Sequence, residues 1–249
     1  MKTRFFLFSI CSTLCAFLSA ESRFFFAPLA DWTQLSSKNT GTFHGGAVGG
    51  IIGYQYRAPM ALFARACATG DWSDLNHIAN SSQIHVTNLA ANANLGFNAN
   101  FGSRKQYTLA PYSGYAYRYL QEHRSIAGFD SYYITYKKPL IPLGISFLVQ
   151  ISSFFSLGLD YQYQFDIDPS AKLNFMKGAF WELKKANDQS IEAILTFKIC
   201  EHWDVQVVPY YTSIKTGRST AVTSDGASLG IQKQTYQMYG GSFGFSYFF

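Results

Sequence analysis

The stretch LGLDYQYQFDID, residues 157–168, alternates strictly between apolar and polar positions. Leucine, tyrosine, phenylalanine and isoleucine occupy its odd positions, and glycine, aspartate and glutamine occupy its even positions. Successive side chains of a β-strand point to opposite faces, so the stretch predicts a strand with one aromatic, apolar face and one polar face. The same alternation recurs in LAANANLGFNANF (89–101) and in SIEAILTFKI (190–199).

The chemistry of the two faces predicts where each one points. In a soluble antiparallel sheet the apolar face packs on the core, and the solvated face is strongly polar. Here the polar face is rich in asparagine, glutamine, serine and glycine, whereas the apolar face is rich in aromatic residues. That distribution is typical of a transmembrane barrel, in which apolar side chains meet lipid and polar side chains fill the lumen.

The composition agrees with a strand-based membrane protein. Aromatic residues make up 18% of the chain, and charged residues only 14%, against roughly 25% in an average soluble domain. The mean hydropathy is nevertheless −0.02, which argues against a bundle of membrane helices, because each of those needs about 20 consecutive apolar residues. The apolar residues must therefore be interleaved with polar ones.

The first 20 residues have the three parts of a secretory signal peptide. Lys2 and Arg4 form a basic start, residues 5–18 form an uncharged apolar core, and Ser19 and Ala20 supply a small-residue cleavage site. We expect export and cleavage, which leaves 21–249 as one barrel domain. Without Lys2 and Arg4 the formal net charge falls from +5 to +3, too small to indicate a nucleic-acid partner.

Turn signals divide the rest of the chain into ten expected strands. Short turns fall near 57–59, 102–106, 152–155 and 200–203, and longer polar segments near 70–83, 121–131, 168–189 and 215–234. The fold class predicted is all-β, a closed antiparallel up-and-down barrel of about ten strands, with eight as the alternative. Residues 168–188 are compatible with a short helix or with extensions of the flanking strands. The expected strands are 23–35, 42–56, 59–69, 84–101, 107–120, 139–151, 154–168, 189–200, 203–215 and 234–249.

Charged and amide side chains on the polar faces predict a network in the lumen. A ten-stranded barrel has a backbone radius of about 10 Å, so side chains nearly fill it, and opposite charges inside should pair. A narrow ion path is the alternative. Around Pro139 a bulge or register shift is expected, which leaves the facing of Lys137 and Lys138 open. The expected lumen residues are Arg65, Arg118, Asp160, Gln162, Gln164, Asp166, Glu192 and Lys198.

Two cysteines remain after cleavage, Cys67 and Cys200. On the expected topology Cys67 lies near the outer end of its strand and Cys200 lies in an inner turn. The thickness of the membrane would then separate them, far beyond the ~7 Å between Cα atoms that a disulfide allows. We therefore expect two unbridged thiols.

The chain ends in YGGSFGFSYFF, residues 239–249, whose alternate positions place Phe243, Phe245, Tyr247 and Phe249 on the lipid face. Aromatic residues at this depth join the interfacial girdle of a barrel. With the export signal and the alternating strands, this ending resembles the bacterial outer-membrane β-barrel family, including small porin-like, Opa-like and OmpX-like barrels. The resemblance implies a bacterial outer membrane of the Gram-negative type and outer-membrane lipid around the barrel. It also implies recognition of these four residues by the barrel-assembly machinery.

The resemblance leaves three functions open. A structural or surface-interaction role, adhesin-like, with a host or surface ligand at the outer loops, is the first expectation, and a narrow porin is the second. The third is an enzyme at the outer rim, because omptin-type proteases carry Asp and His there, so Asp71, Asp74 and His77 need inspection. None of the five histidines shows a metal-ligand spacing, and we expect no catalytic residue, no metal and no cofactor.

Overall fold

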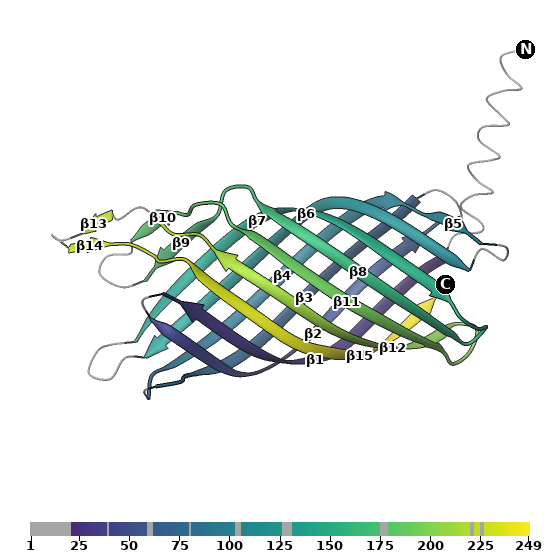
Figure 1. Ribbon diagram of the computed structural model, residues 1–249, viewed down its shortest axis with the longest axis horizontal. Helices are drawn as coiled ribbons and strands as arrows, with labels where there is room; N and C mark the ends of the chain where they lie inside the picture. The colour runs from purple at the N-terminus through teal and green to yellow at the C-terminus, as the bar shows by residue number, and fades with distance from the viewer. Residues whose placement is uncertain are drawn as a thin grey trace, which may run out of the picture.

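Ten long strands close into an antiparallel barrel (Figure 1). The computed structural model describes residues 21–38, 40–58, 62–79, 81–102, 106–125, 131–174, 179–219, 222–224 and 227–249. Closure follows because the last strand pairs with the first as well as with its predecessor. The predicted barrel and its strand number are confirmed, and every expected segment contains a strand. The ten strands are β1 (Glu21–Ser37), β2 (Gly41–Arg57), β3 (Leu62–His77), β4 (Gln83–Phe97), β6 (Tyr107–Ser125), β7 (Tyr132–Gln150), β8 (Phe155–Asp166), β11 (Asn187–Lys198), β12 (Trp203–Thr216) and β15 (Gln234–Phe248).

Among the described residues, five short strands lie at the two ends of the barrel. β5 (Ala99–Phe101) pairs with β6, β9 (Ser170–Leu173) pairs with β7 and β10 (Phe180–Glu182), and β13 (Val222–Ser224) forms a hairpin with β14 (Ala227–Leu229). Of the two alternatives for 168–188, the described part therefore takes the extended one. Residues 175–178 lie outside the described residues.

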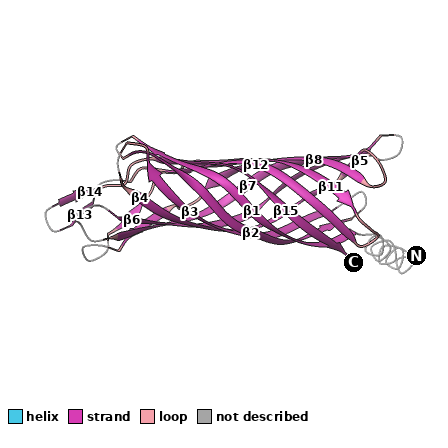
Figure 2. Ribbon diagram, turned by 90° about the horizontal axis from the view of Figure 1, so that it is seen from below, coloured by secondary structure: helices cyan, strands magenta, loops and turns pink. Residues whose placement is uncertain are grey.

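The two ends of the barrel differ in their connections. Glu21 and Phe249 lie at the same end, where the backbone N–H of Phe249 donates to the carbonyl of Ser22 at 3.1 Å, and Figures 1 and 2 show the C-terminus there. We call this end, which has the short connections between strands, the inner end. The opposite end, which we call the outer end, carries β9, β10 and the β13–β14 hairpin. The predicted signal peptide, 1–20, lies outside the described residues.

Two segments expected to be outer loops are strand instead. β3 continues to His77, through most of 70–83, and β6 continues to Ser125, into 121–131. β7 likewise starts at Tyr132 rather than at residue 139. The barrel is therefore longer at its outer end than the sequence suggested, and the expected loops were wrong at 70–77 and 121–125, whereas 126–130 lie outside the described residues. Polar residues in these segments look like loop residues, but they alternate as strand residues do.

The strand register shifts by one residue at Pro139, but on one side of β7 only. β6 and β7 keep one register from Tyr107 opposite Val149 to Arg124 opposite Tyr132. On the other side Lys137 lies opposite Ser170 and Leu140 opposite Asp166, which leaves one extra residue between β8 and β9, so the expected irregularity is confirmed there. Pro139 lies between the last partner of β7 on β8 and its first partner on β9, where the ladder needs no N–H from it. Its carbonyl still accepts a hydrogen bond from the N–H of Ile167 at 2.9 Å. Lys138 is consequently buried inside, and Lys137 is exposed outside.

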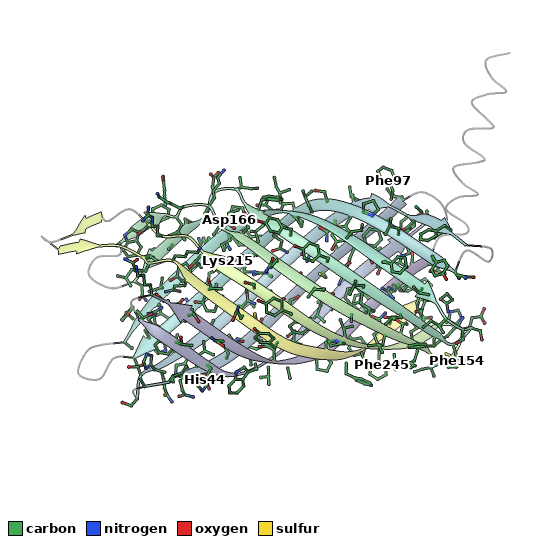
Figure 3. All side chains as sticks on the ribbon, viewed as in Figure 1. His44, Phe97, Phe154, Asp166, Lys215 and Phe245 are labelled. Atoms are coloured by element: carbon green, nitrogen blue, oxygen red, sulfur yellow. The ribbon has the colours of Figure 1, made fainter. Side chains whose placement is uncertain are left out.

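The outer surface carries an apolar band bounded by aromatic residues. Phe97 and Phe245 point outward in Figure 3, and Phe243 and Phe249 of the expected assembly signal are exposed. On β3 the band extends from Leu62 to Trp72, about ten residues, which span about 25 Å at a rise of ~3.3 Å and a tilt of ~40°. That height matches the lipid-facing band of transmembrane barrels. An outer ring of exposed aromatic residues marks its upper limit: Trp32, Trp72, Tyr117 and Tyr239.

Candidate functional site in the barrel lumen

The polarity of the two strand faces reverses at the outer aromatic ring, while the inward and outward positions stay in step. Below Trp72, β3 faces outward with apolar and small residues and inward with polar ones such as Arg65 and Asp71. Beyond Trp72, the outward positions are Asp74 and Asn76, and the inward position between them is Leu75, fully buried. We call the barrel up to the aromatic ring the membrane part, and the barrel beyond it the projecting part.

The projecting part is filled by apolar side chains. They come from β1, β2, β3, β4, β6, β7, β12 and β15, and β9 and β10 cover the side where β8 and β11 end early. We call this cluster the outer plug. The expectation of a polar lumen was therefore wrong for this part, because its outward positions are polar and its apolar side chains are buried inside, away from solvent. The plug consists of Leu35, Phe43, Leu75, Ile84, Val86, Leu120, Ile134, Tyr136, Ala171, Leu173, Ala179, Trp181, Leu183, Ile214, Ile231, Tyr236 and Met238.

A layer of paired charges lies directly beneath the plug. The Lys138 ammonium lies 2.6 Å from a carboxylate oxygen of Asp188 and 3.2 Å from one of Asp166, and Arg118 lies 3.1 Å from Asp188. Lys138 also donates to the carbonyl of Lys215 at 2.7 Å, and Figure 3 labels Lys215 and Asp166 at this level. Two cations and two carboxylates thus balance in a site whose four side chains are buried. We call Arg118, Lys138, Asp166 and Asp188 the charge layer.

The sequence identified half of this layer. Arg118 and Asp166 were expected in the lumen, and the structure places both there. Lys138 was left open because of Pro139, and Asp188 fell just before the expected start of its strand at 189. Asp188 has the same strand parity as Glu192 and Lys198. A strand extended by two residues, to start at 187, would therefore have placed Asp188 in the lumen.

A second buried charge group lies inside the plug. The Glu122 carboxylate, 0% exposed, accepts hydrogen bonds from Arg124 Nε at 2.7 Å and from the Tyr236 hydroxyl. Such a pair is tolerated in an apolar surrounding only because each partner satisfies the other. Sequence reasoning missed both charged residues, which lie in the segment expected to be a loop.

The membrane part holds a polar cavity of about 170 Å³. On its wall the Tyr112 hydroxyl donates to Asp160 at 2.6 Å, and Gln164 donates to Gln162. Arg65 faces Glu192 across the cavity at 3.9 Å. Of the expected lumen residues, these five from β3, β8 and β11 therefore line one space.

The cavity opens toward the inner end. A neighbouring hollow at the inner mouth shares Arg23, Gln55 and Arg57 with it and is lined also by Lys198 and Asp204. Lys198, expected in the lumen, thus lies at the mouth and is exposed. Sequence reasoning missed Arg23 and Arg57, since Arg23 is the first residue of its expected strand and Arg57 follows the end of its own, where strand parity is hard to assign.

The cysteines are both free thiols. Cys67 lies nearer the inner end of β3 than the expected outer end, because the strand continues ten residues further to His77. Its thiol donates to Asn92 Oδ1 at 3.2 Å and lines the polar cavity. Cys200 lies in an inner turn and is exposed, as the sequence suggested.

The three rim residues inspected for catalysis are not brought together. Asp71 is 2% exposed and accepts a hydrogen bond from Asn88 at 2.7 Å in the lumen. Asp74 points outward and contacts His85, whereas His77 lies on the inward face against the ring of Phe43. Within the described ranges, no three His, Cys, Asp or Glu residues are grouped to hold a metal ion. In the same part of the chain, no helix is long and apolar enough to cross a bilayer.

A closed ten-strand antiparallel barrel with an apolar, aromatic-bounded outer band has the fold of the outer-membrane β-barrel proteins. The outer membrane protease OmpT from Escherichia coli superposes with a TM-score of 0.56 at 12% identity, covering 92% of this chain and 96% of OmpT. The translocator domain of the autotransporter NalP from Neisseria meningitidis gives 0.49 at 12% identity, covering 91% and 88%. OprG from Pseudomonas aeruginosa gives 0.41 at 11% identity, covering 93% and 96%. No protein-family model and no curated protein matches the sequence.

Proposed function

We propose that the protein is an integral outer-membrane barrel with a structural or surface-interaction role, adhesin-like, and that it does not conduct. The observation that carries this proposal is the outer plug, which fills the lumen of the projecting part with packed apolar side chains. The terminal aromatic residues would serve the barrel-assembly machinery, and lipid would surround the membrane part.

The narrow porin is the rival, and the lumen argues against it. A hydrated ion would have to pass the charge layer, whose cations are already paired, and then an apolar plug that offers it no ligand. Removing the hydration shell of an ion in such a place costs more free energy than new contacts between the ion and the charge-layer side chains could supply. A static closed lumen therefore favours a role for the outside of the barrel.

The outer wall of the projecting part offers a surface for such an interaction role. Its outer wall carries a cross-strand row of Asp74, His85, His123 and Tyr133, in which His123 stacks on Tyr133 at 4.4 Å between ring centroids. Such a rigid polar and aromatic surface above the lipid suits recognition of another molecule. A rim enzyme is the third candidate, and it is disfavoured because Asp74 and His77 lie on opposite faces of β3.

Planar-bilayer recordings test the closed lumen. The purified protein should give no discrete conductance steps. Replacing 170–183 with a short Gly-Ser linker removes five plug residues and should raise conductance, whereas removing the β13–β14 hairpin, which pairs only with itself in the described sheets, should not. Regular steps from the unmodified protein would favour the porin.

An epitope tag tests location and orientation. A tag between β13 and β14 should bind antibody on intact cells, whereas the same tag in the inner turn at 199–202 should bind only after the outer membrane is opened. Equal labelling of the two tags on intact cells would contradict an oriented outer-membrane barrel.

A further inference from the structure

Three arginines converge on one wall of the polar cavity. Arg23 of β1, Gln55 of β2 and Arg65 of β3 are successive cross-strand partners, and all three point inward. Arg57 lies two residues from Gln55, on the same face and closer to the inner mouth. Each guanidinium therefore borders the same hollow.

These arginines have donors to spare. Arg23 gives both Nε and one Nη to the single side-chain oxygen of Gln55, at 3.0 and 2.5 Å. Arg65 has its carboxylate, Glu192, only at 3.9 Å, and within the described residues neither Arg23 nor Arg57 has an ion-pair partner within 4.0 Å. The Nε atoms of Arg57 and Arg65 are buried and find no hydrogen-bond partner in the described part of the chain. A guanidinium carries five N–H donors, so most of them remain available.

Aromatic rings hold the cations in place. Arg57 lies over the ring of Phe63 at 5.8 Å, and Arg65 over the ring of Phe25 at 5.6 Å. Such stacking fixes the guanidinium planes and leaves their edges free to bind two oxygens of a carboxylate or a phosphate. It also places an apolar wall beside the charged one.

The hollow is reached from one side only. It merges with the inner mouth through Arg23, Gln55 and Arg57, and the charge layer and the outer plug close it toward the outside. A solute that enters cannot pass through. The space is therefore suited to binding rather than to transport.

We propose that this cavity binds a small oxyanion, a carboxylate or a phosphate monoester with an apolar portion, that enters from the periplasmic end. Arg23, Arg57 and Arg65 hold the oxyanion through paired N–H donors, and Phe25 and Phe63 contact the apolar portion. The proposal goes beyond the surface role and does not depend on it.

Cys67 provides the reporter, because its thiol lines the same cavity. In a Cys200→Ser protein, Cys67 is the only thiol after signal cleavage. We expect a sulfonate-bearing methanethiosulfonate to modify it about tenfold faster than a trimethylammonium-bearing one of similar size, since close arginines concentrate the anion. Inorganic phosphate should slow the anionic reagent in a saturable way.

Substitutions assign the effect to the arginines. Arg57→Gln or Arg65→Gln should bring the two rates to within about twofold, whereas Arg57→Lys, which keeps the charge, should retain most of the preference. Lys172→Gln is the matched control, because it removes one positive charge from an exposed site on β9 and should change nothing. Folding of each variant is checked by heat-modifiable electrophoretic mobility.

Two lipid conditions separate the sources of the anion. Protection of Cys67 by phosphate in lipid-free detergent supports a free solute, and protection only in vesicles of anionic lipid supports a lipid headgroup. The proposal is overturned if the two reagents modify Cys67 at equal rates in the protein that keeps all three arginines, and phosphate does not slow the anionic reagent. So does a Cys67 that neither reagent reaches, since the cavity would then be closed at the inner end.

Discussion

The membrane part and the projecting part are built from the same strands but solve opposite solvent problems. In the membrane part the outside is apolar and the inside polar, whereas in the projecting part the outside is polar and the inside is the plug. β6 shows the change within a few residues, from Tyr117 outside and Arg118 inside to Leu120 inside and Gln121 outside. A strand has no preferred apolar face of its own. The solvent at each height selects it.

The charge layer lies at the boundary between the two parts. Above it, apolar residues pack as in a soluble core, and below it the lumen is polar enough to hold water. Substitutions that act differently in the two parts therefore test this division.

The largest effect is expected at the boundary itself. Lys138→Met removes the cation that joins Asp166 and Asp188 and leaves one of these buried carboxylates without its partner. Breaking a buried ion pair from one side costs about 3–5 kcal/mol of unfolding free energy. Urea unfolding in detergent or vesicles measures it, with Lys137→Met, exposed on the outer face, as the control.

The plug should behave as a protein core, and the lipid-facing band should not. Leu120, 1% exposed, lies in the plug, so Leu120→Ala should cost about 2–5 kcal/mol for lost burial and the cavity left behind. Leu143, 47% exposed on the lipid face, should lose clearly less in Leu143→Ala, because lipid chains can fill the space. Equal losses at the two sites would mean that the projecting part is not a packed core.

The fold was predictable because the lipid-facing pattern is local. Leu157, Tyr161 and Phe165 on β8 show by spacing alone which way the strand faces, and the same rule located all ten strands. Ile141, Leu143 and Ile145 on β7 follow the same spacing, and all three are exposed. The rule failed where its assumption of lipid outside failed.

The plug was not predictable from the same pattern. Leu75 stands alone between Asp74 and Asn76, and nothing local distinguishes a core residue there from one apolar residue in a polar loop. Its burial depends on neighbours brought by the closed barrel, such as Ile84 of β4 and Leu35 of β1. For the cavity, Asp160 and Gln162 were placed by parity, whereas Arg23 and Arg57 required the strand ends, which sequence fixes poorly.

An arginine introduced on the outer face should destabilise the membrane part but not the projecting part. Leu143 lies near the middle of the apolar band, so Leu143→Arg should cost about 2–4 kcal/mol, the depth-dependent penalty for a cation facing lipid. Thr42→Arg, on the outer wall of the projecting part, faces water and should change stability by less than about 0.5 kcal/mol. A similar loss at both positions would place the lipid boundary above the aromatic ring.

The smallest effect on stability is expected at the inner end of the membrane part. Phe249 follows the last residue of β15 and is 75% exposed, so Phe249→Ser should change the unfolding free energy by less than about 1 kcal/mol. Its proposed role is in assembly, and the folded fraction in the outer membrane of expressing cells should therefore fall although refolded protein is equally stable. Phe97→Ser, at the same inner edge of the band but away from the terminus, controls for the loss of one lipid-facing ring. Unchanged assembly of the Phe249 variant would remove the terminal residue from that role and leave its ring as an ordinary member of the girdle.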